Sequence, residues 1–569
     1  MASPLPTALP EAIPVGFDGL GGWLHPAGGR TGILMIGATG YEGTNAYRAW
    51  RDLGLRFARA GLPALRLTLP GLGDSPEPDG LPDLVPRWLA AIGTALAWMR
   101  TELELDEVVP CGLHLGALLA AQGAARAGGT ERIIMLAPPA SGAQYMRAQR
   151  ARARLMDFPL EAALPGRVEL PALQLHQQAA RDLEALGFGG IAAARRGLIL
   201  AKREADACPA VACLGDDGAA QRHGFDTEDT LLFLYNQHRW PEPSWAPLAS
   251  WLAPEARPER PVLPPAARPV RHAGWIERHV AIPVAGGTAL AGVHTGPTGA
   301  GAGPAVLLFG TGANPNSGYG RAGAHLARRL AEEGTCSLRA DISGIGDSGG
   351  EREIGLDRLY DAAQTRETGR LLDWMREQGH GRFVLVGICS GAYQALAAAR
   401  TEPGVVGIVL ANQLIHGRWQ GGGVTGWRRR RYTRATEARQ RQAAPRPPRH
   451  VGATAPSRMR LFGAGVRAAV AAEAWFAKIG CRLGLGAAER GLRAATRRGQ
   501  RVLVVLSRED EAMQVMEAQL GPGLRSLGRI QGLETIILPR ADHALGLGTA
   551  QMALRDAVSH FVAGLRERR

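Results

Sequence analysis

The chain contains two copies of one pattern of motifs, separated by about 275 residues. In each copy an apolar strand ends in a glycine turn, a helix-like stretch follows, and a second apolar strand leads into a Gly-x-Gly-Asp-Ser turn. The interval from Gly37 to Asp74 is 37 residues, and the interval from Gly310 to Asp347 is the same. Strands that alternate with helices at this spacing indicate βαβ units and a parallel sheet. We therefore predict an α/β protein with two tandem copies of one fold, each a mostly parallel sheet flanked by helices.

The length of the chain agrees with this organisation. A single hydrophobic core stops growing near ~250–300 residues, and this chain has 569. The stretch 253–274 is rich in Pro and Arg, which predicts a stiff, extended linker. We expect the first domain at 1–252 and the second at 275–569, where the first strands are predicted near His279–Pro283 and Ala289–Thr295.

A third landmark follows in each copy, a Gly-x-residue-x-Gly turn between an apolar strand and an Ala-rich stretch with high helix propensity. The central residue is Cys389 in the second copy and His114 in the first. This pattern is typical of a nucleophile elbow, in which two glycines allow a tight turn that raises the central side chain above the sheet. The start of the next helix favours a thiolate there. The alternative interpretation is a buried cysteine at a tight strand–helix crossing.

Two more polar residues follow strands later in the second copy. Asp510 comes after the apolar strand Arg501–Leu506, and His543 comes after the strand Thr535–Leu538. The order nucleophile, acid, histidine is the one expected of such a fold, and parallel sheets bind ligands at the carboxyl ends of their strands. The ordinary alternatives are a helix cap and a surface histidine. Three neighbouring acids compete with Asp510, which we favour because it lies just beyond the strand end: Glu509, Glu511 and Asp542.

These residues predict a Cys–His–Asp triad. His543 would take the thiol proton, Asp510 would hold the imidazole tautomer, and Cys389 would form an acyl-enzyme. The backbone N–H groups of Ser390 and Thr311 are the expected oxyanion hole, because they follow the nucleophile and the first core strand. No metal and no cofactor are expected.

The first copy is predicted to lack a nucleophile, since His114 cannot repeat the acyl-enzyme route of Ser or Cys. Asp216-Asp217 is expected at the acid position and His238 after a last strand at Leu231–Leu234. We interpret the copy as retained for packing or substrate binding, and a distinct chemistry at His114 is the alternative. Because this copy keeps the Gly-x-Gly-Asp-Ser turn, the turn that contains Asp347 in the second copy is predicted to be structural.

The elbow, the Gly-x-Gly-Asp-Ser turn and the terminal strand–Asp-His–helix together resemble the α/β-hydrolase superfamily, in its serine-aminopeptidase-like or esterase-like group. The resemblance covers 15–252 and 275–567. The first copy is also loosely similar to hydrolases that accompany exosortase and exopolysaccharide gene clusters, through Gly40-Tyr41-Glu42, Leu69–Ser75 and the run from Pro138 to Arg150. The resemblance implies ester, thioester or acyl-transfer chemistry. Cysteine in place of the usual serine is shared with dienelactone hydrolases and polyhydroxyalkanoate synthases.

The basic character of the chain belongs to one segment. Residues 418–500 contain 18 Arg and one Lys against three Glu, a net charge of +16, whereas the whole chain carries +14. The segment falls in a predicted cap insertion, about 412–500, with helix-like stretches at Arg460–Ile479 and Ala487–Arg498. One interpretation is a lid that attracts an acidic glycan, phosphopantetheine or CoA. The others are a solvated basic loop and a membrane-surface segment. No motif for nucleic acid recognition accompanies the charge.

The remaining composition narrows the class of protein. Six cysteines in 569 residues do not make a disulfide framework. Four of them lie in or beside strand-like runs and are interpreted as ordinary buried thiols: Cys111, Cys208, Cys213 and Cys336. Neither a signal peptide nor a transmembrane segment is expected, so a cytoplasmic location is the default.

Three functions remain open at this stage. The leading hypothesis is a hydrolase that cleaves an ester or thioester through an acyl-enzyme on Cys389. The second is an acyltransferase that moves the acyl group to a glycan or another acceptor. The third is a noncatalytic tandem scaffold with a basic partner-binding arm. The expected partner is a small-molecule or glycan acyl substrate, and the sequence identifies neither that substrate nor the oligomeric state.

Overall fold

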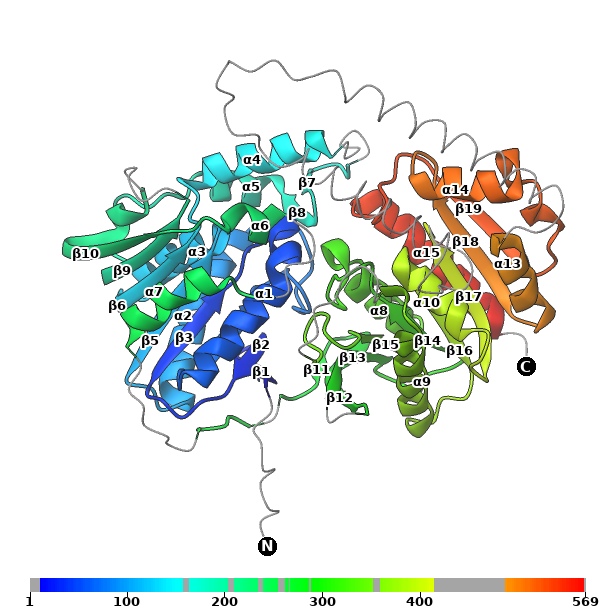
Figure 1. The fold of residues 1–569 in the computed structure, drawn as a ribbon, viewed down its shortest axis with the longest axis horizontal. Helices are drawn as coiled ribbons and strands as arrows, with labels where there is room; N and C mark the ends of the chain where they lie inside the picture. The colour runs from blue at the N-terminus through cyan, green and yellow to red at the C-terminus, as the bar shows by residue number, and fades with distance from the viewer. Residues whose placement is uncertain are drawn as a thin grey trace, which may run out of the picture.

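The chain folds into two mostly parallel, mixed β-sheets, each flanked by helices, that lie side by side (Figure 1). The computed structural model describes residues 11–156, 163–202, 209–233, 239–253, 261–265, 267–285, 288–350, 359–413 and 487–566. We call residues 11–253 the first half and residues 261–566 the second half. The predicted α/β class with two sheets is confirmed.

In the first half, eight strands form one sheet. They are β1 (Ile13–Phe17), β2 (Leu20–His25), β3 (Thr31–Ile36), β4 (Ala64–Thr68), β5 (Glu107–Leu113), β6 (Thr130–Leu136), β9 (Ala194–Ala201) and β10 (Leu214–Gly224). The helices are α1 (Gly40–Arg59), α2 (Leu84–Glu102), α3 (Leu115–Arg126), α4 (Gly142–Leu155), α5 (Gln177–Glu184), α6 (Glu228–Phe233) and α7 (Glu242–Leu252). A separate hairpin joins β7 (Arg167–Leu170) to β8 (Leu173–His176).

In the second half, nine strands form the other sheet. They are β11 (Val270–Arg271), β12 (Trp275–Pro283), β13 (Ala289–Pro297), β14 (Ala305–Phe309), β15 (Ser337–Ala340), β16 (Phe383–Ile388), β17 (Val405–Ala411), β18 (Arg501–Ser507) and β19 (Leu533–Leu538). The longer helices are α8 (Ala322–Glu332), α9 (Ala362–Glu377), α10 (Ser390–Ala398), α13 (Ala487–Arg497), α14 (Glu511–Leu520) and α15 (Gly548–Arg566). Among the described residues, no helix is long and apolar enough to cross a membrane.

The two sheets have the same strand order. The first runs β1-β2-β4-β3-β5-β6-β9-β10, and the second runs β12-β13-β15-β14-β16-β17-β18-β19 with β11 added at its edge. In both, the second strand pairs antiparallel with each of its neighbours, β1 and β4 in the first sheet and β12 and β15 in the second. The strands beyond it pair parallel, as the alternation of strands and helices predicts. Each strand of the eight-stranded sheet therefore has a counterpart in the other sheet, and the two sheets can be compared position by position.

Helices cover both faces of each sheet, because most residues of the central strands are apolar and buried. In the first half α2, α3 and α5 pack on one face and α1, α6 and α7 on the other. In the second half α9, α10, α13 and α14 pack on one face and α8 and α15 on the other. Strands that are buried on both sides are typical of parallel sheets. The carboxyl ends of the strands therefore remain as the place where polar side chains can meet.

The end of the first half differs from the sequence prediction. Leu231–Leu234 was expected as its last strand, but residues 228–233 form helix α6. Such a short apolar run fits either period, and Glu228 and Asp229 in the first turn favour a helix. The last strand is β10, and it contains Asp216-Asp217, so this pair does not follow the strand equivalent to β18, which is β9. His238 lies outside the described residues.

Two equivalent arginine–aspartate pairs join the halves. Arg66 on β4 binds Asp347, which lies in the Gly-x-Gly-Asp-Ser turn of the second half. Arg339 on β15 binds Asp74, in the corresponding turn of the first half, at 2.5 Å. Each arginine precedes the aspartate of its own half by eight residues but binds the aspartate of the other. The contact is therefore self-complementary, as in a twofold-symmetric dimer.

A second pair of arginines extends this symmetry to the backbone. Arg48 on α1 and Arg321, just before α8, occupy equivalent positions in the two copies. Arg48 donates hydrogen bonds of 2.6–3.2 Å to the carbonyl oxygens of Gly346, Ser348 and Gly350. Arg321 donates to the equivalent carbonyl oxygens of Gly73, Ser75 and Glu77. Each turn is thus held by arginines of the opposite half, in agreement with the predicted structural role of the turn that contains Asp347.

The crossed pairs predict unequal costs of substitution. Asp347→Ala leaves Arg66, whose side chain is 5% exposed, with His25 as a neutral partner, so we expect the free energy of unfolding to fall by about 3–5 kcal/mol. Asp74→Ala should cost less, because Arg339 keeps its ion pair with Glu277. Urea denaturation measures both. The control is Asp106→Ala, which removes the exposed pair with Arg30 and should change stability little. An Asp347→Ala protein as stable as the control would contradict this account of the interface.

Candidate active site

Cys389 lies in a strained turn between β16 and α10. Its backbone has φ 55° and ψ −111°, a conformation that residues with a side chain seldom adopt. Both flanking glycines are required by contact. A Cβ at Gly387 would lie 2.1 Å from the backbone of Gly391, and a Cβ at Gly391 would lie 2.6 Å from the carbonyl oxygen of Gly310. The geometry is that of the predicted elbow, and the side chain of Cys389 is 8% exposed.

The first half keeps this backbone without the cysteine. His114 has φ 55° and ψ −119°, and the equivalent glycines, Gly112 and Gly116, leave no more room for a Cβ. Burial lowers the pKa of His114, and its Nδ1 atom has no hydrogen-bond partner among the described residues. The ring packs edge-on against Tyr145 at 5.5 Å. A neutral, buried imidazole in aromatic contact agrees with a copy that has lost the nucleophile and keeps the turn.

The structure brings His543 and Asp510 together. Nδ1 of His543 lies 2.9 Å and 3.0 Å from the two carboxylate oxygens of Asp510. Asp510 is also the N-cap of α14, where its Oδ1 accepts a hydrogen bond of 2.8 Å from the N–H of Ala512. The sequence left helix cap and histidine partner as alternative roles for Asp510, and Asp510 has both. The cap fixes the carboxylate, and the carboxylate fixes the imidazole.

The other ring nitrogen of His543 is the one available to Cys389. Burial acts to lower the pKa of His543, but attraction by Cys389 and hydrogen bonding to Asp510 and Cys389 outweigh it, so the pKa is raised well above 6.5. Nε2 is buried and has no well-aligned hydrogen bond to any described residue. The contact between Cys389 and the ring is therefore not an aligned hydrogen bond, and such contacts are commonly loose before substrate binds.

The competing acids have other partners. Asp542 accepts hydrogen bonds from the N–H groups of Ala544 and Gly546, at 3.2 Å and 2.7 Å, and so holds the loop after β19. Glu509 accepts from the N–H of Arg540 at 3.0 Å. Of these, Asp510 is the acid hydrogen-bonded to the ring of His543.

The sequence missed a residue that positions the histidine loop. Asn412, directly after β17, is fully buried and donates from Nδ2 to the carbonyl oxygen of His543 and to Oγ of Ser507, both at 2.9 Å. Its Oδ1 accepts from the N–H of Ser507 at 2.8 Å. The side chain therefore ties the ends of β17 and β18 to the loop that carries His543. The signal was present, since a polar residue that ends an apolar strand faces the edge where ligands bind.

The two expected oxyanion donors lie on segments that are joined to each other. Thr311 is in the turn after β14, and Ser390 begins α10. The N–H of Gly312 donates to Oγ of Ser390 at 2.9 Å, which holds this turn against the elbow. The role of the backbone N–H groups of Thr311 and Ser390 as donors of the oxyanion hole stays a prediction.

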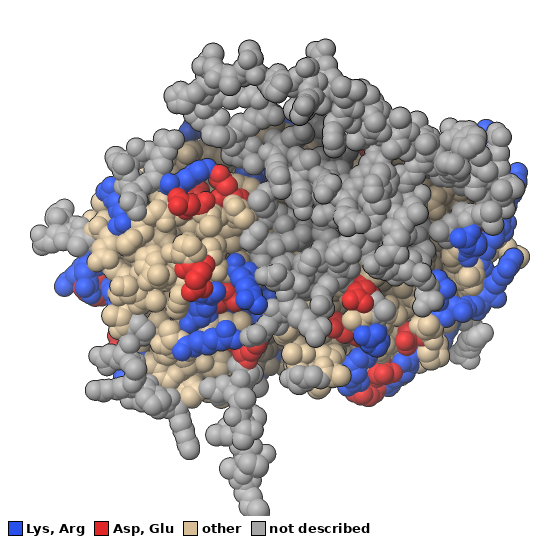
Figure 2. Space-filling view, viewed as in Figure 1, with Lys and Arg blue, Asp and Glu red and all other residues tan. Residues whose placement is uncertain are grey.

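The predicted cap is mostly outside the described residues. Residues 414–486, which include the helix expected at Arg460–Ile479, are the part that lies outside. The helix expected at Ala487–Arg498 is present as α13. Figure 2 shows Lys and Arg along the edge of the molecule where α13 lies in Figure 1. The described end of the insertion is therefore basic, as its composition predicts.

The comparisons with known proteins give α/β-hydrolases as structural neighbours. A dienelactone hydrolase from Anabaena variabilis is 14% identical, with a TM-score of 0.31, over 52% of this chain and 100% of that one. An esterase from Pyrococcus furiosus is 13% identical, with a TM-score of 0.33, over 52% and 100%. An α/β-hydrolase from a Penicillium species is 19% identical, with a TM-score of 0.32, over 51% and 99%. No protein-family model and no curated protein matches the chain. At these scores no activity carries over from the neighbours.

The strain at the elbow predicts the order of stability of two variants. Cys389→Gly should be more stable than Cys389→Ala by about 1 kcal/mol or more, because glycine adopts positive φ without the cost that alanine pays. His114→Gly and His114→Ala should show the same order. Ala97→Gly, at an exposed position inside α2, is the control with the opposite sign, a loss of roughly 1 kcal/mol. Chemical denaturation gives all five values, and equal stability of each Gly and Ala pair would refute the strain.

The raised pKa of His543 depends on two neighbours, and each can be removed. Cys389→Ser removes the sulfur and Asp510→Asn removes the carboxylate, so both variants should lower the pKa of His543 relative to wild type. Histidine resonances followed by NMR through a pH titration measure it. Cys336→Ser, a thiol before β15, is the control that should leave this pKa unchanged. A His543 that titrates at the same pH in Cys389→Ser and wild type would exclude contact between the two side chains.

Proposed function

We propose that this chain is a cysteine-dependent hydrolase of esters or thioesters, with Cys389 as nucleophile, His543 as acid and base, and Asp510 as the residue that orients the imidazole. The observation that carries the proposal is the hydrogen-bonded Asp510–His543 pair beside a cysteine in a strained elbow. Asp–His pairs with a purely structural role are common. Here Cys389, in the elbow, gives the pair a nucleophile on which the imidazole could act.

The raised pKa of His543 favours an imidazole that takes the proton of the Cys389 thiol, which would produce the attacking thiolate. The thiolate would attack the carbonyl carbon, and the negative charge would pass to the carbonyl oxygen. The N–H groups of Ser390 and Thr311 are the proposed donors to that oxygen. Nε2–H of His543 would then protonate the leaving alkoxide or thiolate as the C–O or C–S bond breaks, which leaves an acyl group on Cys389 and a neutral imidazole.

Hydrolysis of the acyl-enzyme uses the same groups in reverse. Neutral His543 would take a proton from water as the water oxygen attacks the acyl carbon, and the thiolate would leave. Asp510 would hold Nδ1 throughout, because its helix-capping bond fixes the position of the carboxyl group. The class of substrate is a small acyl ester or thioester, and the basic α13 is in keeping with an anionic leaving group such as a CoA-type phosphate.

Trapping of the acyl-enzyme tests the proposal. Incubation of the full-length protein with a p-nitrophenyl ester, an acyl-CoA or a fluorophosphonate should add one adduct, found on Cys389 by intact mass and peptide mapping. Asp510→Asn should slow adduct formation by roughly 10²-fold or more, because the imidazole loses its orientation. With the p-nitrophenyl ester, a burst of p-nitrophenol would report acylation of the enzyme, and the steady rate after it would report turnover.

Matched variants separate the three functions that the sequence left open. Cys389→Ala should abolish the adduct, whereas Cys336→Ser should retain it. An acyl-enzyme that persists in water and discharges when a glycan or another hydroxyl acceptor is added would replace hydrolase by acyltransferase. A folded wild-type protein that forms no adduct with any of the three probes would exclude the enzyme and leave the scaffold.

A further inference from the structure

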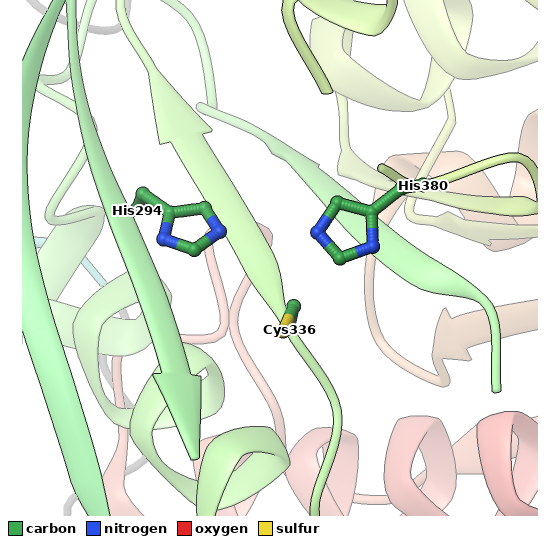
Figure 3. Close-up of side chains that lie close together, drawn as sticks. All are labelled: His294, Cys336 and His380. Carbon is green, nitrogen blue, oxygen red and sulfur yellow. The ribbon is translucent and has the colours of Figure 1, made fainter. Parts of the chain in front are cut away.

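A second cluster of reactive side chains lies at the opposite end of the second sheet. It consists of His294 on β13, Cys336 just before β15 and His380 in the loop before β16, and one ligand atom of each lies within 4.8 Å of the others. Figure 3 shows the two imidazole rings on either side of the sulfur. Cys336 and His380 precede the parallel strands β15 and β16, whereas Cys389 follows β16. The cluster is therefore separated from Cys389 by the length of a strand and takes no part in the acyl chemistry.

The first half provides an internal comparison for these three positions. The pairing of β2 with β4 and of β13 with β15 makes Leu24 the counterpart of His294 and Pro63 the counterpart of Cys336. The pairing of β5 and β16 with their neighbours makes Leu105 the counterpart of His380. All three counterparts are buried and apolar. Two histidines and a cysteine thus stand at the positions of three apolar residues. A change that served packing alone would not need all three positions to become potential metal ligands.

The ligand set is specific in its chemistry. Imidazole nitrogen and thiolate sulfur suit zinc and copper, and the set contains no carboxylate of the kind that magnesium, calcium and manganese prefer. Nε2 of His294 is buried and has no hydrogen-bond partner among the described residues, so it is free to be a ligand.

The residues around the three side chains pack against them and form their hydrogen bonds elsewhere. Trp374 on α9 packs edge-on against His294 at 5.6 Å. Arg278 lies over the same indole ring and donates to Oε1 of Gln378 at 2.6 Å. A Cβ at Gly301 would lie 3.0 Å from the sulfur of Cys336, so the loop before β14 approaches the thiol closely. Cys336 as a residue is partly exposed.

We propose that His294, Cys336 and His380 form a zinc site that joins β13, β15 and the α9–β16 loop. Cys336 would bind as the thiolate and release its proton on binding, and the two imidazoles would bind as neutral ligands. Three protein ligands leave one position of a tetrahedral ion for water. The site connects segments far apart in the chain, so zinc would stabilise the folded second half.

Metal titration of the full-length protein, stripped of metal by dialysis against a chelator, tests the site. Co²⁺ should bind at one ion per chain with a thiolate-to-metal charge-transfer absorption, and Zn²⁺ should displace it and raise Tm. His294→Gln, Cys336→Ser and His380→Gln should each weaken Zn²⁺ binding by at least about tenfold, because each removes a direct ligand. Cys336→Ser should also abolish the charge-transfer absorption.

Two controls exclude the obvious competitors. Cys389→Ser should keep full binding and absorption, which shows that the elbow cysteine and His543 are not the metal ligands. His272→Gln alters an exposed histidine of the same half and should also bind normally. If any of the three ligand variants fails to fold, alkylation of the wild-type protein remains informative, because bound Zn²⁺ should protect Cys336 from iodoacetamide. Binding that survives all three substitutions, an unprotected Cys336, or binding of Cu⁺ without Zn²⁺ would overturn the zinc site.

Discussion

The crossed pairs between Arg66 and Asp347 and between Arg339 and Asp74 determine how the two sheets meet. Each pair takes a buried guanidinium from one half and a carboxylate from the turn of the other, and Arg339 has a further ion pair with Glu277 of its own half. A buried arginine without its acid is costly, because desolvation is then not offset by attraction. This dependence gives the first half a structural role that does not need a nucleophile. The first half supplies the arginines, Arg48 and Arg66, that hold the Gly-x-Gly-Asp-Ser turn of the second half.

The two elbows separate what belongs to the fold from what belongs to the chemistry. His114 and Cys389 share an almost identical strained backbone, with glycines that have no room for a side chain on either side. The strain therefore does not depend on a nucleophile. What the second half adds lies in the loops, where Asp510 caps α14 and holds His543, while Asn412 ties the histidine loop to β18. In the first half, β10 lies where β19 carries that loop, and His114 packs against Tyr145 instead.

The sequence predicted the parts of this arrangement that depend on local pattern. Strands, turns, the elbow and the positions of Asp510 and His543 follow from apolar runs and from the residues at their ends. The contact between halves was missed, although Arg66 and Arg339 were a signal, since each is a charge inside a buried strand eight residues before the same aspartate. The strand predicted at Leu231–Leu234 was wrong, because four apolar residues fit a helix as well as a strand. Cys336 was interpreted as an ordinary buried thiol because its histidine neighbours lie more than forty residues away on either side.

Comparison of the copies sharpens inferences that either copy alone would leave open. Where the halves agree, as at the arginines, the aspartates and the elbow glycines, the shared residues serve folding and association. Where they differ as a group, the difference points to chemistry. The second half departs from the first at the carboxyl end of β16, with Cys389 in place of His114, and at the amino end of the sheet, with His294, Cys336 and His380 in place of an apolar cluster. A metal at the amino end would restrain β15 and the loop that leads into β16. Because β16 ends at Cys389, that restraint would act on the strand that carries the elbow without placing a metal ligand near the nucleophile.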